Sequence, residues 1–134
     1  MKARGSVSIA LLLFCTLMCL AGIPFAQENE TEVQYQVIRL LSEEIVPSIT
    51  IIQLGTVVIW VNEDCKPTEI RFTNPNGMVI ACDGSKSFIA DPERIISQMI
   101  PCAGVESLCL VQKGEFKYVV KRGSRELKGT IIVE

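Results

Sequence analysis

The side chains that carry most protein chemistry are unevenly represented in this sequence, which contains no histidine. Imidazole is the usual general base near neutral pH and the commonest ligand of zinc and copper. Histidine-dependent catalytic triads, zinc hydrolase sites and histidine-bound haem are therefore excluded. The sequence also lacks the phosphate-binding motifs G-x-x-x-x-G-K-[ST] and G-x-G-x-x-G, so nucleotide chemistry has no support in it.

Two pairs of adjacent carboxylates, Glu43-Glu44 and Glu63-Asp64, are the remaining candidates for acid–base catalysis. Neighbouring side chains on a β-strand point to opposite faces, so the two carboxylates of a pair would not act on one substrate. A solvated surface position fits both pairs better. We therefore expect a protein that is not an enzyme, with no catalytic residues and no cofactor.

Residues 1–26 have the pattern of a secretory signal peptide. Two cations precede an almost unbroken apolar run from Val7 to Cys19, and small residues follow up to Ala26. The apolar run is shorter than the roughly 18 residues that a transmembrane helix needs. We expect cleavage after Ala26, or alternatively after Ala21, to release a secreted or periplasmic domain of residues 27–134 that is not inserted in the membrane.

Four cysteines remain after this cleavage, and an even number in an exported chain is the usual mark of disulfides. None of them forms a C-x-x-C motif, so a thioredoxin-like redox site, a zinc ribbon and c-type haem attachment are unsupported. Their spacing does not resemble the paired ligands of a four-thiolate metal site, which stays as the alternative. The candidates for disulfides are Cys65, Cys82, Cys102 and Cys109.

The charge of the exported domain is negative overall but unevenly distributed. Removing residues 1–26 leaves 11 Lys and Arg against 15 Asp and Glu, a net charge of −4, so neither nucleic acid nor an anionic membrane is an expected partner. Cations nevertheless crowd the segment 113–128. Besides a solvated face, this segment could form a contact patch for a protein partner, made of Lys117, Lys121, Arg122, Arg125 and Lys128.

The elements that must position these residues are short strands, because β-branched runs are broken by Gly, Asn and Pro at short intervals. Val33, Tyr35 and Val37 alternate with polar residues, which predicts a first half-buried strand. The continuous apolar run 56–61 predicts a central strand packed on both sides, with Trp60 in the core. Further strands are expected at 49–54, 69–72, 78–81 and 129–133, with a hairpin of 108–120 across Lys113-Gly114.

One short helix is predicted near residue 91, where Asp91 could cap it and Pro92 would take its first position. Together these elements make about seven or eight strands. That number of short strands at such spacing predicts an all-β, Greek-key β-sandwich.

Two separated motifs resemble the cupredoxin family, and the second of them consists of two stretches. Residues 47–72 resemble the family's P-x-x-I-x-V-x-x-G-x-x-V-x-W-V-N-x-D-x-x-P-H-T-V-x-F, and residues 114–118 resemble its G-T-Y-x-Y. Residues 127–133 resemble its closing M-K-G-T-I-x-V. The similarity covers residues 45–134 apart from 73–99, and it implies a cupredoxin-like sandwich.

The copper ligands of that family, two histidines, a cysteine and usually a methionine, are missing. Thr68 stands in the slot of the first histidine, Val120 in that of the cysteine and Leu127 in that of the methionine, and the second histidine would fall near Gly123 or Ser124. Without histidine, a type 1 copper site cannot be assembled.

Sulfur side chains offer the alternative of a Cu(I) site, because thiols and thioethers suit that ion. Met78 and Met99 lie in apolar, strand-like segments, however, where we expect them to pack in the core.

The predicted function is therefore an exported, non-enzymatic binding or interaction module with an unknown protein partner. The alternatives are a periplasmic copper-binding or electron-transfer protein with Cys and Met ligands, or an accessory subunit of a redox complex.

The resemblance also implies a pairing of the cysteines. In a cupredoxin-like sandwich the loop after Asn62 and the loop before Leu108 open at the same end, which brings Cys65 and Cys102 together. A second bridge between Cys82 and Cys109 follows if their strands are neighbours. The competing pairing joins Cys102 to Cys109.

Overall fold

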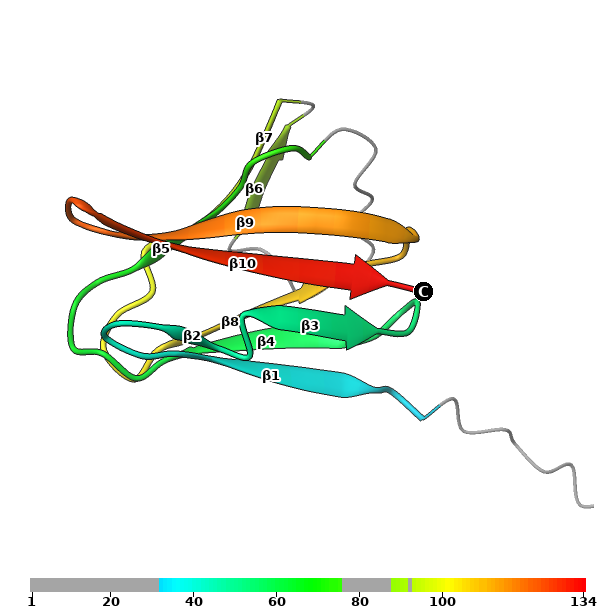
Figure 1. Ribbon diagram of the computed structural model, residues 1–134, viewed down its shortest axis with the longest axis horizontal. Helices are drawn as coiled ribbons and strands as arrows, with labels where there is room; N and C mark the ends of the chain where they lie inside the picture. The colour runs from blue at the N-terminus through cyan, green and yellow to red at the C-terminus, as the bar shows by residue number, and fades with distance from the viewer. Residues whose placement is uncertain (1–31, 76–87, 92) are drawn as a thin grey trace, which may run out of the picture. The chain divides into compact units, whose positions relative to one another are not determined.

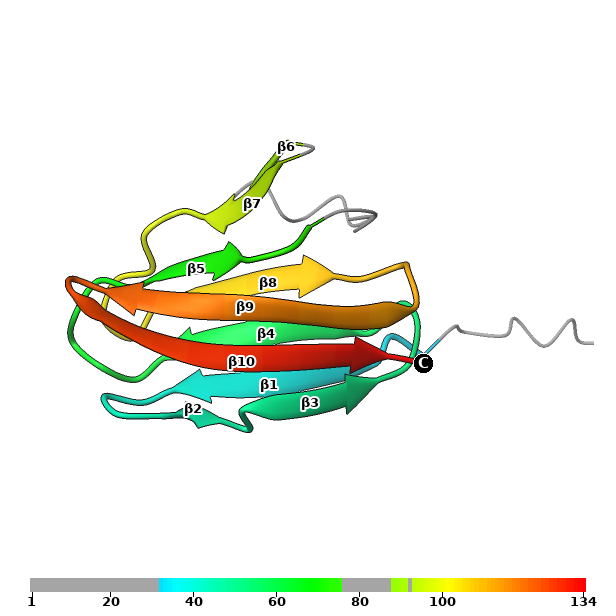
Figure 2. The same ribbon diagram turned by 45° about the horizontal axis from the view of Figure 1, so that its top comes forward.

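The computed structural model describes residues 32–75, 88–91 and 93–134, and within them it contains ten strands in two sheets (Figures 1 and 2). No helix of this part of the chain is long and apolar enough to cross a membrane. The four-stranded sheet has the order β2-β1-β4-β8, formed by Ile45–Val46, Tyr35–Leu40, Val57–Asn62 and Val105–Cys109. The six-stranded sheet has the order β3-β10-β9-β5-β7-β6, formed by Ile49–Ile52, Arg125–Val133, Gly114–Arg122, Glu69–Phe72, Arg94–Ser97 and Phe88–Asp91.

The two sheets pack face to face through alternate residues of their strands, which confirms the predicted all-β sandwich. Trp60 on β4 is fully buried, as predicted. Its ring lies 5.6 Å from that of Tyr118, 6.2 Å from that of Phe72 and 6.0 Å from that of Phe88, measured between centroids. These three rings belong to the six-stranded sheet, so Trp60 joins the two layers.

Gly129 connects the two stretches of the second motif, residues 114–118 and 127–133. It lies opposite Tyr118 in the β9–β10 pair, and the Tyr118 ring lies directly over it. A β-carbon at residue 129 would overlap that ring. Only glycine therefore leaves room for the aromatic side chain that packs against Trp60.

The buried face of the first strand differs from the prediction. Val33, Tyr35 and Val37 are 51%, 64% and 47% exposed, whereas Ile38 and Leu40 are fully buried. Apolar residues occupy both alternations of this segment, so alternation alone could not select the inward face. The parallel register with β4 selects it, because Ile38 lies beside the buried Trp60.

The prediction for the central strand was right in position and partly wrong in packing. β4 lies between β1 and β8 in its sheet. Its inward residues Val58 and Trp60 are fully buried, but the outward residues Val57, Ile59 and Val61 are only half-buried. One face of this strand therefore borders on solvent.

The predicted hairpin of residues 108–120 is wrong, because β8 pairs with β4 and β9 lies in the other sheet. The segment between Cys109 and Gly114 crosses from one sheet to the other. The hairpin is formed instead by β9 and β10, where Arg122 lies opposite Arg125 and Gly123 has a φ of +58°. Glycine adopts this left-handed conformation without the steric penalty of other residues.

The predicted short helix is also wrong. Asp91 lies opposite Arg94 in the antiparallel pair of β6 and β7, so the chain reverses direction there. An Asp-Pro sequence favours the start of a β-turn as well as the start of a helix, which is why the sequence misled the prediction. The strand predicted at 78–81, with Met78, lies outside the residues that the structure describes.

Candidate functional site

Four connecting segments meet at one end of the sandwich, on the left in Figure 1. They are the turn after β1, the loop after β4, the loop before β8 and the turn between β9 and β10. Cys65 in the second of these segments forms a disulfide with Cys102 in the third. This confirms the bridge that the cupredoxin resemblance implied, and it excludes a bond between Cys102 and Cys109.

Cys109 is buried on β8, and its sulfur lies 3.5 Å from the carbonyl oxygen of Gly55. Cys82 lies outside the described residues. The predicted bridge between Cys82 and Cys109 therefore stays a prediction.

Arg122, the last residue of β9, occupies the centre of this end of the sandwich. It continues the inward alternation of Phe116, Tyr118 and Val120, and only 2% of its side chain is exposed. A guanidinium group carries five N–H donors in a rigid plane, and a buried one needs acceptors for all of them. The fold supplies five hydrogen bonds.

The acceptors of Arg122 come from segments far apart in the sequence. Its Nε donates to Thr68 Oγ1 at 2.8 Å, and its Nη2 donates to the Leu40 carbonyl at 2.9 Å and to Asn62 Oδ1 at 3.4 Å. Its Nη1 donates to the Leu41 carbonyl and, at 3.3 Å, to Asp64 Oδ2. The guanidinium thus ties β9 to the end of β1 and to the loop after β4. We call Arg122 and these five acceptor residues the guanidinium network.

Asn62 extends this network to the loop before β8, and the Thr68 hydroxyl extends it within the loop after β4. The fully buried Asn62 has Nδ2 at 3.0 Å from the carbonyls of Lys66, Ile100 and Pro101. The Thr68 hydroxyl donates to the Lys66 carbonyl at 3.1 Å while it accepts from Arg122. These contacts hold the disulfide-bonded loops in one arrangement.

The charge of Arg122 is compensated mainly by neutral groups. Burial lowers the pKa of the guanidinium below its usual value, and the nearby carboxylate of Asp64 opposes this effect. Asp64 is the only charged acceptor among the five, and its side chain is 16% exposed. The network therefore stabilises a buried cation chiefly through hydrogen bonds.

The residues at this end do not fit a copper ion. The Thr68 hydroxyl, in the slot of the first histidine, is already bonded to Arg122, while Val120 and Leu127 offer only hydrocarbon. Type 1 copper requires nitrogen and sulfur ligands. The guanidinium of Arg122 is hydrogen-bonded to the residue in the slot of the first histidine, and its positive charge repels a metal cation. Among the residues described, no group of three or more His, Cys, Asp or Glu lies together.

The sulfur donors of the alternative Cu(I) site are dispersed. Cys65 and Cys102 are bonded to each other, and Met78 and Cys82 lie outside the described residues. Met99 is 57% exposed, so the prediction that it packs in the core is wrong. It lies in the connection just before Ile100, outside any strand, where alternation does not direct its side chain inward.

The five members of the predicted contact patch do not form one surface. Lys117, Lys121 and Lys128 alternate with the inward residues of β9 and β10 and lie on the outer face of the six-stranded sheet. There Lys117 pairs with Glu115 and Lys121 with Glu126, each at 3.2 Å. We call the outer face that carries these three lysines the lysine face. Arg122 is buried, and Arg125 lies at the end of the sandwich.

A pocket of about 300 Å³ opens beside the buried guanidinium. We call it the end pocket. Arg125 at its rim pairs with Glu43 and donates to the Ser42 carbonyl at 3.2 Å, and Lys66 has no ion pair within the described ranges. The lining residues are Ser42, Glu43, Asp64, Lys66, Arg122, Ser124 and Arg125, which carry three cations and two carboxylates.

The prediction of a solvated surface position was wrong for Asp64, whose side chain is 16% exposed and accepts from Arg122. Neither Lys66 nor Asp64 was predicted to lie at a functional site. Both flank Cys65, so a disulfide to the loop before β8 was the feature that could have placed them at this end. Arg122 could have been recognised as inward by extending the alternation of Phe116, Tyr118 and Val120 by one more step.

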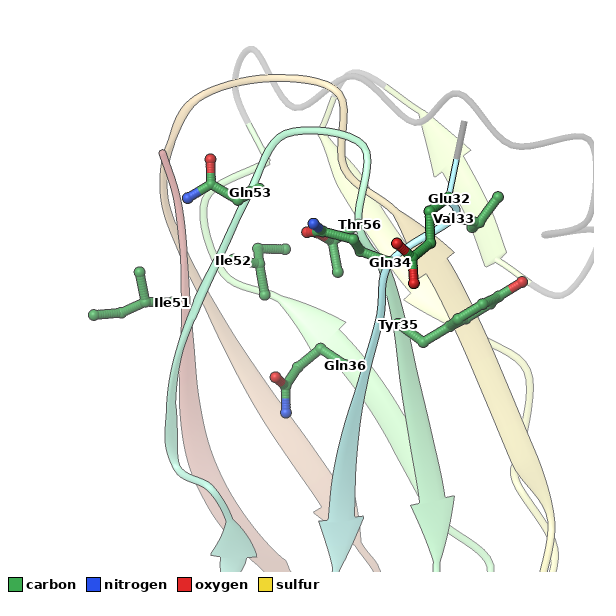
Figure 3. Close-up of a pocket in the computed structure, with 9 residues that line it drawn as sticks. All are labelled: Glu32, Val33, Gln34, Tyr35, Gln36, Ile51, Ile52, Gln53 and Thr56. Atoms are coloured by element: carbon green, nitrogen blue, oxygen red, sulfur yellow. The ribbon is translucent and has the colours of Figure 1, made fainter. Parts of the chain in front are cut away.

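A second pocket, of about 450 Å³, lies between the start of β1 and the end of β3 (Figure 3). Gln36 and Ile52 point into the space between these strands, whereas Tyr35 and Ile51 point away from it. Glu32 is its only charged lining residue, and Thr56 and three glutamines supply most of the remaining polar groups. Nothing in this lining converges as a catalytic group would.

The chain is similar in structure to amicyanin, a cupredoxin. The Cu(I) form of one amicyanin mutant matches with a TM-score of 0.58 at 16% identity, over 78% of this chain and 87% of that one. A second mutant with Cu(I) gives 0.56 at 16%, over 73% and 80%, and a third in the reduced Cu(I) form at pH 4 gives 0.56 at 15%, over 80% and 87%. No protein-family model and no curated protein matches the sequence. Identities this low show the fold alone, which is cupredoxin-like, as the two motifs implied.

Proposed function

We propose that this chain is an exported, non-enzymatic, cupredoxin-like module that binds a protein partner and holds no type 1 copper. The observation that carries the proposal is the hydrogen bond of 2.8 Å from the Arg122 guanidinium to Thr68 Oγ1. It joins the segment that would hold the later copper ligands to the slot of the first one. The end of the sandwich that serves metal binding in the resembled family is thus occupied by a structural cation.

Export is supported by the signal-peptide pattern of residues 1–26 and by the Cys65–Cys102 disulfide. Disulfides persist in oxidising compartments and are rare in the cytosol. The same disulfide uses two of the sulfur donors on which a Cu(I) protein would depend. A secreted or periplasmic binding module is therefore the better account.

The contact surface that we propose is the end pocket. It holds one more cation than carboxylates, in a domain whose net charge is negative. Two ion pairs within the pocket, Arg125 with Glu43 and Arg122 with Asp64, show that its guanidinium groups bind carboxylates. A partner that presents acidic side chains would find Lys66 without a competing ion pair and could displace Glu43 from Arg125.

The test is the binding of a short glutamate-rich peptide, measured by calorimetry at low salt. We expect binding that weakens as salt is added and is lost in the double variant Lys66→Ala/Arg125→Ala. The matched control is Lys117→Ala/Lys128→Ala, which removes the same charge from the lysine face. Equal loss in both variants, or no binding by the unmodified protein, would contradict the proposed surface.

A further inference from the structure

The outer edge of β3 lacks a strand partner among the described residues, because β3 pairs only with β10. The carbonyls of Ser48 and Ile52 accept from the backbone N–H groups of Thr130 and Glu134 at 2.9 and 3.0 Å. Successive residues of a strand direct their backbone groups to opposite edges. The N–H and C=O groups of Ile49 and Ile51 therefore point away from β10, where another strand could bind them.

This edge carries none of the charges that usually protect exposed strands. Ile49 and Ile51 are 63% and 61% exposed, and no residue from 45 to 62 is charged. The free part of β1 differs, because the Gln36 side chain donates to the Val37 carbonyl at 3.0 Å and so covers its edge. An uncharged, apolar edge strand with unpaired backbone groups is a template for strand addition.

We propose that β3 pairs in antiparallel fashion with β3 of a second copy of this chain, around a two-fold axis. Residues directly opposite each other share a face of the sheet, so the exposed isoleucines must meet isoleucines. The register that achieves this places Ile49 opposite Ile51 of the second copy and Thr50 opposite its equivalent. Because the strand is uncharged, this self-pairing meets no electrostatic repulsion.

The backbone geometry agrees with this register. Ile49 and Ile51 are the residues whose N–H and C=O groups face outward, so each opposed pair of them can exchange two hydrogen bonds. Thr50 then stands in the non-hydrogen-bonded position of the register, with its own backbone groups directed to β10.

Thr50 contributes no side-chain surface to this pairing. It is 3% exposed, and its buried hydroxyl has no hydrogen-bond partner within the described part of the chain. The copies would therefore meet through the backbone groups and the exposed side chains of Ile49 and Ile51, while the Thr50 side chain stays enclosed on the core side of the sheet.

The experiment is sedimentation velocity of the purified protein over a range of concentrations. We expect a reversible dimer, and Ile51→Lys should weaken it by about tenfold or more. Ile89→Lys is the matched control, because Ile89 is 64% exposed on β6 at the opposite edge of the same sheet. Circular dichroism of both variants confirms that they are folded.

Amide hydrogen exchange of the same samples identifies the surface that pairs. The Ile49 and Ile51 amides should gain protection as the dimer forms, whereas the Thr50 amide, which faces β10, should be protected at every concentration. A dimer that leaves the Ile49 and Ile51 amides exposed would overturn the proposal, since the copies would then meet elsewhere. A monomer with both amides protected would also overturn it, because a segment of the same chain would cover the edge.

Discussion

Arg122 decides what the end of this sandwich can do. A single inward-facing arginine fills it with hydrogen-bond donors. Their acceptors lie at the end of β1 and in the turn after it, and at the end of β4 and in the loop after it. Removing it would leave the carbonyls of Leu40 and Leu41 and the side chains of Asn62 and Asp64 without this donor. Buried polar groups without a partner are costly.

We therefore expect Arg122→Leu to lower the free energy of unfolding by about 3–5 kcal/mol, as the loss of one partner from a buried charged network does. Arg122→Lys should recover little of this free energy of unfolding, because a compact ammonium cannot reach acceptors in five directions. Urea denaturation measures both effects. A leucine variant as stable as the unmodified protein would show that the network contributes no net stability.

Tyr118 makes a pH-dependent contribution. Burial raises the pKa of its hydroxyl from 10 to about 12, so the folded protein holds the phenol proton more tightly than the unfolded chain. The stabilisation is complete below pH 10 and is lost as the pH rises towards 12, by up to about 2–3 kcal/mol. Unfolding free energies over this interval should fall less steeply for Tyr118→Phe. Identical slopes would contradict the buried placement of the hydroxyl.

At the scale of the elements, the sequence predicted alternating strands well and their partners poorly. The strand predicted at 69–72 is present as β5, where the apolar Ile70 and Phe72 are buried and alternate with the half-buried Glu69 and Arg71. In β1 the choice of face failed because both alternations are apolar. The supposed hairpin of β8 and β9 failed because strand pairing depends on contacts between distant segments, which local patterns do not contain.

The disulfide gives a prediction for the loops at the end of the sandwich. Cys65 and Cys102 are separated by 37 residues, and closing a loop of this length stabilises a fold by about 3–4 kcal/mol. Cys65→Ala, Cys102→Ala and the double variant should therefore lose similar amounts in chemical denaturation, because each removes the same bond. Losses that add in the double variant would show that the two cysteines act separately.

At the scale of the whole molecule, the two motifs predicted the cupredoxin-like fold, and the empty ligand slots predicted that the chain lacks the family's copper site. The sequence could not predict the guanidinium network. Its carbonyl acceptors lie 81 and 82 residues before Arg122. Every residue carries a backbone carbonyl, so the residue types do not indicate which carbonyls accept these hydrogen bonds. The end pocket depends on the same long-range folding, since Lys66 and Arg125 meet only when the loops close.

The central claim is a cupredoxin-like sandwich in which Arg122 fills the end that carries the empty ligand slots. The absorption spectrum of the purified, oxidised protein during copper(II) addition tests this claim most directly. Type 1 copper produces an intense blue absorption band through its copper–thiolate bond. We predict no such band at any ratio of copper to protein. An intense blue band that saturates at one copper per chain would contradict the account.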